Sequence, residues 1–176
     1  MNCSSKQPGR QMAIIETARL LIRPFVIEDL DELYHLYTME ELMQYVDGDV
    51  RSRDGTKKYL QNYIADYERY GFGLCAAILR STGQMIGRCG LIPTPTKAGI
   101  EGELAIMFKK ECWGLGLATE VGRAIVRYAF DKMQLARIFA KVNRDNVASI
   151  RVSQKLGMHC VRSSTTDVEY EIRRLE

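Results

Sequence analysis

The sequence predicts an α/β domain whose first half is antiparallel and whose middle contains one parallel step. Two short apolar runs, residues 72–79 and 85–92, are separated by a Ser-Thr-Gly-Gln turn, which is a hairpin signal. Further along, an apolar run at 103–108, a helical stripe at 117–128 and a second run at 136–142 have the spacing of a parallel crossover. The nearly unbroken apolar character of 103–108 predicts a central strand that is buried on both faces.

The remaining elements follow from hydrophobic periodicity and turn residues. In chain order they are a strand at 17–25, a helix at 28–45 ended by the turn 47–49, a helix at 54–70 ended by Gly71, a proline-containing loop at 93–99, a helix at 146–156 ended by Gly157, and closing strands at 158–162 and 167–172.

Length and composition favour one domain. A chain of 176 residues with 46% apolar residues builds one sizeable core, and we expect a flexible arm at 1–12 before a single domain at 13–176. The formal net charge is only +3, with no long run of like charges, which argues against a nucleic-acid partner. No apolar stretch approaches the roughly 20 residues needed to cross a bilayer, so we expect a cytoplasmic protein without a membrane partner.

Cysteine and histidine usage gives no sign of a metal or a disulfide framework. The five cysteines are scattered, odd in number and never spaced as a CxxC pair, and the chain has only two histidines. This pattern predicts reduced thiols and no metal site.

The segment 111–120 (ECWGLGLATE) joins the end of the buried strand to the start of a helix. Gly114 and Gly116 allow close backbone approach, and the free amides of a first helical turn attract anions. A dinucleotide fingerprint would need a third glycine where Thr119 stands, and the Gly-Lys-Ser/Thr of a P-loop is missing. An anion site and an ordinary helix start with convenient glycines both remain open on this pattern alone.

Three stretches resemble a known family. WGLGLATE (113–120) resembles the acetyl-CoA pyrophosphate loop of the Gcn5-related N-acetyltransferases (GNAT), in the form found in the RimJ/RimL-like branch that acetylates ribosomal-protein N-termini. TARLLIRP (17–24) resembles the TxRLxLRP opening of that branch, and 146–158 resembles its NxxSxxxxxKLGF segment. The resemblance implies a GNAT acyl-CoA N-acyltransferase fold, a mixed and mostly antiparallel sheet with a splayed central parallel strand pair and about four helices. It also implies acetyl-CoA as co-substrate and no metal.

The resemblance further implies which residues contact acetyl-CoA. They are Ile106, Met107, Phe108, Glu111, Cys112, Trp113, Gly114, Leu115, Gly116, Leu117, Ala118, Thr119, Asn143, Asn146, Ser149, Arg151 and Lys155. The chain departs from the family at Glu111, where Gln or Arg is usual. We therefore expect backbone amides to carry the phosphates, with Lys109, Lys110 or Arg151 offsetting this acid.

Asn146, Ser149 and Ser153 share one face of the last helix. They are open to two interpretations, an N-cap followed by surface serines or a set of cofactor contacts. The family often has a tyrosine at the position of Ser153, which protonates the departing thiolate. Because a thiol has a pKa of about 8.5, its thiolate leaves with little help, so a catalytic Ser153 contributes modestly.

An amine attacks a thioester only when it is uncharged, so the site needs a route for a proton. Glu103 begins the buried strand, and the resemblance implies that an acid there acts as catalytic base; Glu101 is the competing candidate and a solvated strand end is the plain alternative. A backbone amide at 106–108 is the expected oxyanion donor. A nucleophilic Cys112 is the less favoured route, because no histidine is near it in sequence.

These observations predict an N-acetyltransferase acting on a primary amine, with a protein or peptide N-terminal α-amine as the leading acceptor. Polyamines, aminoglycosides or amino acids are the alternative acceptors, and a non-catalytic acyl-CoA-binding regulator is the alternative class. We expect the acceptor pocket at the first two helices and the loop 163–166, in a monomer or homodimer.

Overall fold

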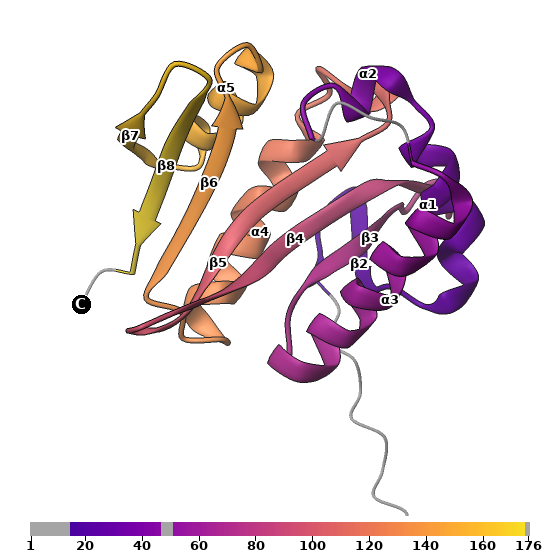
Figure 1. Cartoon of the computed structure of the whole chain (residues 1–176), viewed down its shortest axis with the longest axis horizontal. Helices are drawn as coiled ribbons and strands as arrows, with labels where there is room; N and C mark the ends of the chain where they lie inside the picture. Colours follow the sequence, from indigo (N-terminus) through magenta and orange to yellow (C-terminus); the bar gives the residue numbers. More distant parts are fainter. Residues whose placement is uncertain (1–14, 47–50, 175–176) are drawn as a thin grey trace, which may run out of the picture.

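The computed structural model describes residues 15–46 and 51–174. The expected arm at 1–12 and the expected turn at 47–49 lie outside these residues. The described chain forms one eight-stranded sheet with the order β1-β2-β3-β4-β5-β6-β8-β7 (Figure 1). The strands are β1 Ile15–Glu16, β2 Leu20–Pro24, β3 Leu74–Leu79, β4 Met85–Thr96, β5 Gly99–Phe108, β6 Arg137–Asn143, β7 His159–Ser163 and β8 Asp167–Arg173.

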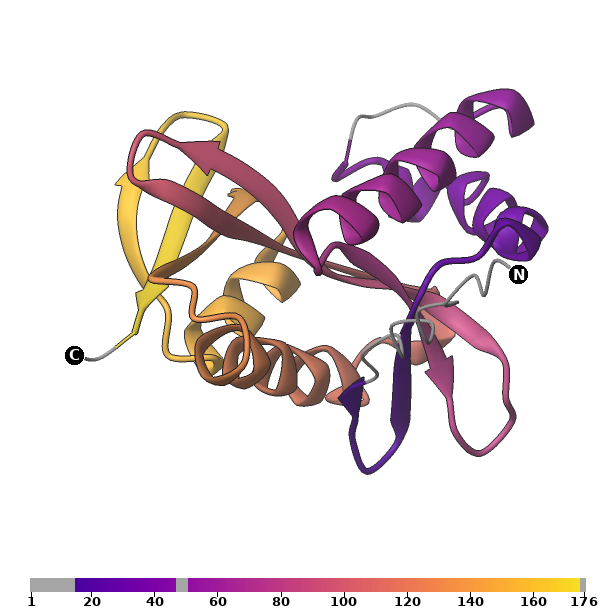
Figure 2. The same cartoon turned by 90° about the horizontal axis from the view of Figure 1, so that it is seen from below.

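The α-helices cover the sheet from both sides. They are α1 Leu30–Tyr37, α2 Glu40–Met43, α3 Arg53–Tyr70, α4 Leu117–Asp131 and α5 Val147–Lys155, with short 3-10 turns at Ile27–Asp29 and Lys110–Cys112. Helices α1 and α3 pack on β3 and β4 from one side, whereas α4 packs on β1, β4 and β5 and α5 on β6 from the other (Figure 2). Within the described residues, no helix covers the α1–α3 face of β6 and β8 in either view (Figures 1 and 2).

The predicted parallel step is present between β5 and β6. Only two register pairs join the strands, Gly102 with Ile138 and Glu103 with Phe139, and beyond them the strands diverge. On their other edges β5 pairs with β4 over its full length and β6 pairs with β8. The central position of β5 and the splayed pair are therefore confirmed.

Two predicted elements are wrong in detail at the N-terminal side. The single helix expected at 28–45 is interrupted, because Met39 adopts an extended conformation between α1 and α2. The opening strand expected at 17–25 is present as β2 but is shorter, because residues 17–19 form a tight turn from β1 in which the Thr17 amide donates to the Leu20 carbonyl oxygen. The five α-helices exceed the four expected because of the first of these breaks.

The loop expected at 93–99 is also wrong except for a turn at 97–98, since β4 runs to Thr96 and pairs with β5 from Gly87 to Thr96. On the other edge of β4, the pairing with β3 stops at Gly90, which lies opposite Leu74, the first residue of β3. Residues after Gly90 therefore have a strand on one side only, and an edge of this kind tolerates Pro93 and Pro95 because no ladder bond is lost.

Apolar packing divides into two clusters, one on each face of the sheet. The cluster under α4 includes Leu104, Phe108 and Val121, and the cluster under α1 and α3 includes Leu33, Leu60 and Met107. Because side chains alternate along β5, Glu103 lies on the same face as Met107. The candidate base thus faces the side of α1–α3, opposite α4 and α5.

Candidate active site

The start of α4 is open. Gly116 is its N-cap, in the left-handed region at φ 78°, and no side chain caps the helix. Gly114, two residues earlier, is also left-handed at φ 73°. The amides of the first turn of α4 have no intrahelical acceptor. They therefore remain available to a ligand, at a helix terminus that favours negative charge.

The loop before α4 is anchored at two carbonyl groups rather than by buried side chains. The Trp113 indole donates to the Phe108 carbonyl oxygen at 2.7 Å, and Arg19 Nη1 donates to the Leu115 carbonyl oxygen at 2.9 Å. The Trp113 and Leu115 side chains themselves are 46% and 56% exposed. Polar contacts thus fix a loop that has little apolar packing of its own.

Arg19 also binds Glu120 in the first turns of α4. The Arg19 amide donates to Oε1 at 2.9 Å, and its guanidinium Nε and Nη2 both lie 2.7 Å from Oε2. Partial desolvation acts to raise the pKa of Glu120, but hydrogen bonds from Thr17 and Arg19 and the charge of Arg19 lower it below its ordinary value. Glu120 is therefore ionised and its charge is matched by Arg19.

A hollow of about 770 Å³ opens between this loop, the β1–β2 turn and α4. Its charged lining consists of four cations and two carboxylates, which are Arg19, Arg123, Arg127, Lys155, Glu16 and Glu120. Among the expected contacts, Gly116, Thr119 and Lys155 line it as well, whereas Arg151 is exposed elsewhere on α5. The positive balance of this hollow, beside an open helix start, suits an anionic ligand.

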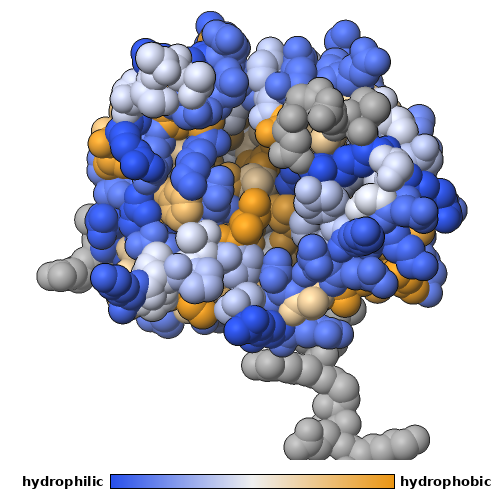
Figure 3. Space-filling view, in the orientation of Figure 1, coloured by the Kyte–Doolittle hydropathy of each residue, from blue (hydrophilic) through white to orange (hydrophobic). Residues whose placement is uncertain are grey.

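A second opening lies where β5 and β6 part. Beyond Glu103 no register pair within the described residues joins Ile106, Met107 or Phe108 to β6. Figure 3 shows a hollow with apolar atoms in its floor at the place where the two strands diverge in Figure 1. The backbone edge of β5 is therefore available to a slender ligand in this gap.

Glu103 stands at the closed end of the gap, opposite Phe139. Burial raises the pKa of Glu103 above its ordinary value, while the charge of Lys141 lowers it and that of Glu169 raises it. The competing acid, Glu101, is bound by Arg137 at 2.6 Å. A partly desolvated carboxyl with a raised pKa is suited to accept a proton near neutral pH, which favours Glu103 over Glu101.

Helix α5 shows the N-cap, one part of the first interpretation of its polar face. Asn146 is the N-cap, since its side-chain oxygen accepts from the Ser149 amide at 3.0 Å. Ser153 is 3% exposed, and its hydroxyl donates to the Ser149 carbonyl oxygen at 3.2 Å. The interpretation of Ser153 as a surface serine is therefore wrong, because this position of α5 is buried. Asn143 accepts from the Asp145 amide at the end of β6.

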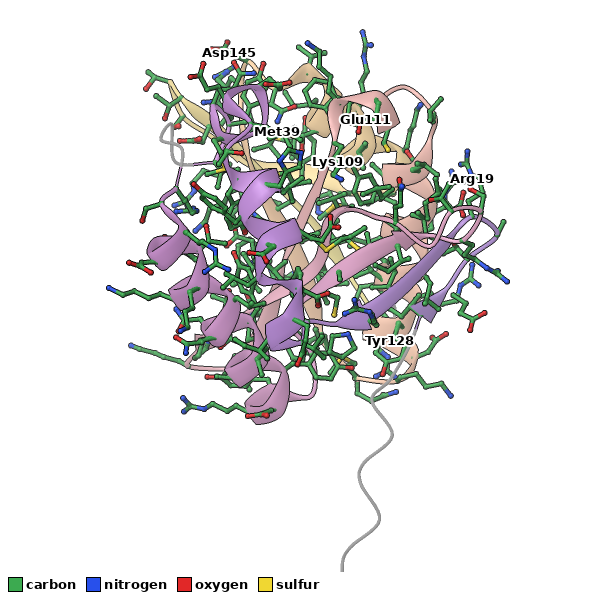
Figure 4. The ribbon with its side chains drawn as sticks, turned by 90° about the vertical axis from the view of Figure 1, so that its right-hand side faces the viewer. Arg19, Met39, Lys109, Glu111, Tyr128 and Asp145 are labelled. Atoms are coloured by element: carbon green, nitrogen blue, oxygen red, sulfur yellow. The ribbon has the colours of Figure 1, made fainter. Side chains whose placement is uncertain are left out.

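Glu111 and Cys112 follow the end of β5. Figure 4 shows Lys109 and Glu111 in this segment, and Lys109 Nζ lies 4.0 Å from Glu32 of α1, so its charge is shared with a second acid. Cys112 is buried, and burial raises the pKa of its thiol, with Glu111 raising it further and Lys109 lowering it. A thiol of this kind is a poor nucleophile near pH 7.

The sequence alone assigned no role to Arg19, Glu120, Arg123 or Arg127. Arg123 and Arg127 follow Thr119 at intervals of four, so the helical period places the three on one face of α4. This spacing could have predicted that the three residues line one surface. The contact between Arg19 and Glu120 joins residues 101 positions apart and has no such signal.

No metal centre is found in the part of the chain that the structure describes, where no three His, Cys, Asp or Glu side chains gather closely enough to hold an ion. None of the helices in residues 15–46 and 51–174 has the length and apolarity of a membrane span.

The splayed β5–β6 pair, with an open glycine-rich helix start after β5, defines an α/β domain of the acyl-CoA N-acyltransferase type. A family model described as an acetyltransferase (GNAT) domain matches residues 19–159. The chain belongs to this family of N-acetyltransferases.

Relatives and solved structures agree with this assignment. The chain is 31% identical over 144 residues to the uncharacterized protein YkkB of Bacillus subtilis, covering 81% of this chain and 83% of YkkB. It is 29% identical to the uncharacterized N-acetyltransferase YnaD of the same organism, over 82% of this chain and 81% of YnaD.

Two solved structures share the fold at low sequence identity. RimL, a ribosomal L7/L12 α-N-protein acetyltransferase in complex with coenzyme A, has a TM-score of 0.79 at 18% identity and covers 92% of this chain and 98% of its own. A spermidine N-acetyltransferase from Vibrio cholerae, in complex with CoA and spermine, has a TM-score of 0.72 at 18% identity and covers 88% and 95%. The RimJ/RimL-like branch is thus one of several neighbours.

Proposed function

We propose that this N-acetyltransferase transfers acetyl from acetyl-CoA to the α-amine of a protein or peptide N-terminus, by direct attack in a ternary complex. The observation that carries the proposal is the parting of β5 and β6 directly after Glu103, next to the open start of α4. The enzyme acts in the cytoplasm as one domain over residues 13–176, as a monomer or homodimer.

The residues present fit the co-substrate. The diphosphate of acetyl-CoA binds the amides of residues 114–119, and the cations of the hollow, Lys155 among them, offset its charge. The pantetheine arm lies in the gap between the diverging strands, along residues 106–108. Glu111, Cys112 and Trp113 precede the diphosphate loop, and Asn143, Asn146 and Ser149 lie at the end of β6 and the start of α5, where we also expect contacts with the co-substrate. Arg151, by contrast, is exposed and does not line the hollow.

The chemistry needs one proton acceptor and a site for the developing negative charge. Glu103 takes one proton from the acceptor ammonium, directly or through water, and the neutral amine then forms its bond to the thioester carbon. An amide among residues 106–108 stabilises the oxyanion until the carbon–sulfur bond breaks. The leaving thiolate needs little assistance, and the second proton of the nitrogen reaches it through the buried Ser153 hydroxyl or a water.

The acceptor class rests on pKa values and charge. An α-amine with a pKa of about 8 is roughly 10% neutral at pH 7, whereas a lysine with a pKa of about 10.4 is far less so, and the α-amine demands less of the base. On the face of Glu103, the carboxylates of Glu101, Glu169 and Glu171 are bound by Arg137, which reduces their pull on a polycation. The likeness to RimL supports this choice.

Two other functions have specific observations in their favour. The likeness to a spermidine N-acetyltransferase favours a small amine as acceptor. The serine at 153, already bonded to the Ser149 carbonyl oxygen, favours a non-catalytic acyl-CoA-binding regulator that lacks an effective acid.

One panel separates the three. The full chain is incubated with acetyl-CoA and a peptide with a free N-terminus, the same peptide with a blocked N-terminus and one lysine, spermidine, and an aminoglycoside. Thiol release and product mass are followed. We expect thiol release with acetylation at the free α-amine. Product from spermidine or the aminoglycoside alone contradicts the peptide acceptor, and calorimetric CoA binding without thiol release on any amine contradicts the enzyme.

A further inference from the structure

Arg19 lies in the tight turn between β1 and β2, far from the phosphate loop in sequence but in contact with it. It makes two kinds of contact with the segment that opens α4, a hydrogen bond to the Leu115 carbonyl oxygen at 2.9 Å and the ion pair with Glu120 at 2.7 Å. In Figure 4 Arg19 lies at the end of the N-terminal hairpin (indigo ribbon). One side chain therefore ties this hairpin to both sides of Gly116.

The contact with the Leu115 carbonyl fixes an amide. In a planar trans peptide the carbonyl oxygen of one residue and the amide hydrogen of the next point in opposite directions. Arg19 holds the Leu115 oxygen towards the β1–β2 turn, so the Gly116 amide hydrogen points away from that turn. The glycines on either side of Leu115 are both left-handed, and glycine reaches other backbone conformations at little cost, so the hydrogen bond from Arg19 helps to select the orientation of this peptide plane.

The contact with Glu120 removes a repulsion. This carboxylate is the fourth residue of α4, within the turn whose free amides attract anions. Left uncompensated, its negative charge would oppose an approaching phosphate. Arg19 balances it with contacts from Nε and Nη2, although the Arg19 side chain is 47% exposed, and Glu120 in turn holds Arg19 where it reaches Leu115.

We propose that Arg19 is a positioning residue for the diphosphate of acetyl-CoA, acting through the peptide between Leu115 and Gly116 and through Glu120. This inference rests on the proposed function, because it assumes that the start of α4 receives the diphosphate. Arg19 sets the direction of the Gly116 amide and neutralises Glu120, and it takes no part in the transfer of the acetyl group.

The test compares two acetyl donors that share the thioester and the pantetheine arm. Acetyl-CoA carries the diphosphate together with its 3′-phosphoadenosine, and S-acetylpantetheine lacks both. For Arg19→Ala we expect the KM for acetyl-CoA to rise about tenfold, the order of one lost charge-assisted hydrogen bond at a partly exposed site, with kcat within about twofold. With S-acetylpantetheine, kcat/KM is expected to equal that of the wild type. An equal loss with both donors overturns the inference.

Arg19→Lys separates positioning from charge. Lysine keeps the positive charge but lacks the planar fork that reaches Leu115 and Glu120 together, so we expect most of the rise in KM to remain. Full recovery of the wild-type KM by lysine means that charge alone matters and overturns the positioning role. Because lysine preserves the charge balance of the fold, it also serves if the alanine variant is unstable.

Arg80→Ala is the matched control. Arg80 is an exposed arginine that donates to the Thr17 carbonyl oxygen at 2.7 Å, so its hydrogen bond holds the same turn rather than the loop. We expect a KM for acetyl-CoA within about twofold of the wild type. A rise equal to that of Arg19→Ala assigns the effect to the turn and overturns the inference. If the wild type binds no CoA in calorimetry, the proposed function is wrong. If the wild type binds CoA but Arg19→Ala has an unchanged KM for acetyl-CoA, only this inference is wrong.

Discussion

Glu103 on β5 lies directly opposite Phe139 on β6, and this is the last pair before the two parallel strands diverge. The carboxyl therefore sits where the sheet opens, on the face that carries α1–α3 over its other half. Its partial burial, which raises its pKa, comes from the same geometry. Position and proton affinity are thus set together by the point at which the strands part.

The pH dependence of the proposed transfer tests Glu103. A base works only when deprotonated, so kcat/KM rises as pH passes upward through the raised pKa of Glu103. Lys141→Met removes a positive charge that lowers this pKa, and the acidic limb is expected at higher pH. Glu103→Gln is expected to lose that limb and about a hundredfold in kcat/KM, at the low end for a general base.

Glu101→Gln is the control for this series, since Glu101 is bound by Arg137. We expect its kcat/KM and its acidic limb to stay close to those of the wild type. An unchanged pH profile of kcat/KM in Glu103→Gln, or loss of the acidic limb in Glu101→Gln, would show that Glu103 is not the base.

Ser153→Ala is expected to reduce turnover by less than roughly a hundredfold, because the thiolate leaves with little help from an acid. The hydroxyl already donates to the Ser149 carbonyl oxygen, which limits its availability further. Steady-state turnover beside calorimetric CoA binding measures the effect. Complete loss of activity with binding intact contradicts this view.

Cys112→Ala is expected to keep turnover within about twofold, because burial raises the pKa of this thiol and disfavours a nucleophilic role. An alkylating thiol reagent at pH 7 provides a second measurement. We expect mass spectrometry to find modification at the exposed Cys160 well before Cys112. An acetyl adduct on Cys112 after incubation with acetyl-CoA would reverse the assignment.

The ion-pair cluster around Arg137 makes stability depend on acid. Its partners Glu169 and Glu171 both have a pKa below the ordinary value of 4.5. Desolvation acts to raise the pKa of Glu169, but hydrogen bonds from Arg137 and Arg162 lower it. The pKa of Glu171 is lowered chiefly by the hydrogen bond from Arg173. A lowered folded pKa contributes stability that is present above the unfolded value and is lost as pH falls through the folded value. We therefore expect the melting temperature to fall below about pH 4.5, and less steeply in Glu171→Gln. If the melting temperature falls equally steeply with pH in the wild type and in Glu171→Gln, the cluster does not cause the loss of stability in acid.

Gly90→Ala is expected to destabilise the fold by about 3 kcal/mol or more through strain and a backbone clash. Gly90 has φ 148°, and an added Cβ would lie 2.2 Å from the Gly73 carbonyl oxygen. Gly83→Ala is the control, since Gly83 is also left-handed but faces open space, and it should cost about 1 kcal/mol. Denaturant unfolding compares the free energies of unfolding of the two variants. Equal decreases would show that the close approach of Gly90 to Gly73 does not matter for stability.

Local patterns in the sequence were sufficient for most of the elements. The hairpin of β3 and β4, the central strand β5 and the stripe of α4 each carry a periodicity or turn residues within a short window, and the structure confirms them. The loop predicted at 93–99 failed because proline reads as a breaker, whereas this stretch is a free strand edge. Which edge of a strand is unpaired depends on the end of β3, and no local window contains that information.

For the site, the sequence by itself predicted the glycine-rich start of α4 and the presence of Glu103 on the strand before it, and it offered the N-cap at Asn146 as one of two interpretations. The prediction that Glu103 begins that strand is wrong, because β5 begins at Gly99, where pairing with β4 extends the strand. The correct predictions depend on residue type and short spacing, since a glycine or a capping side chain acts within a few residues. Tertiary structure alone decided that β5 and β6 separate after Glu103, that Ser153 faces inward, and that Arg19 reaches Leu115 and Glu120. Those contacts join chain segments brought together only when the sheet forms, because the energy that selects them comes from packing and charge pairing across long sequence separations.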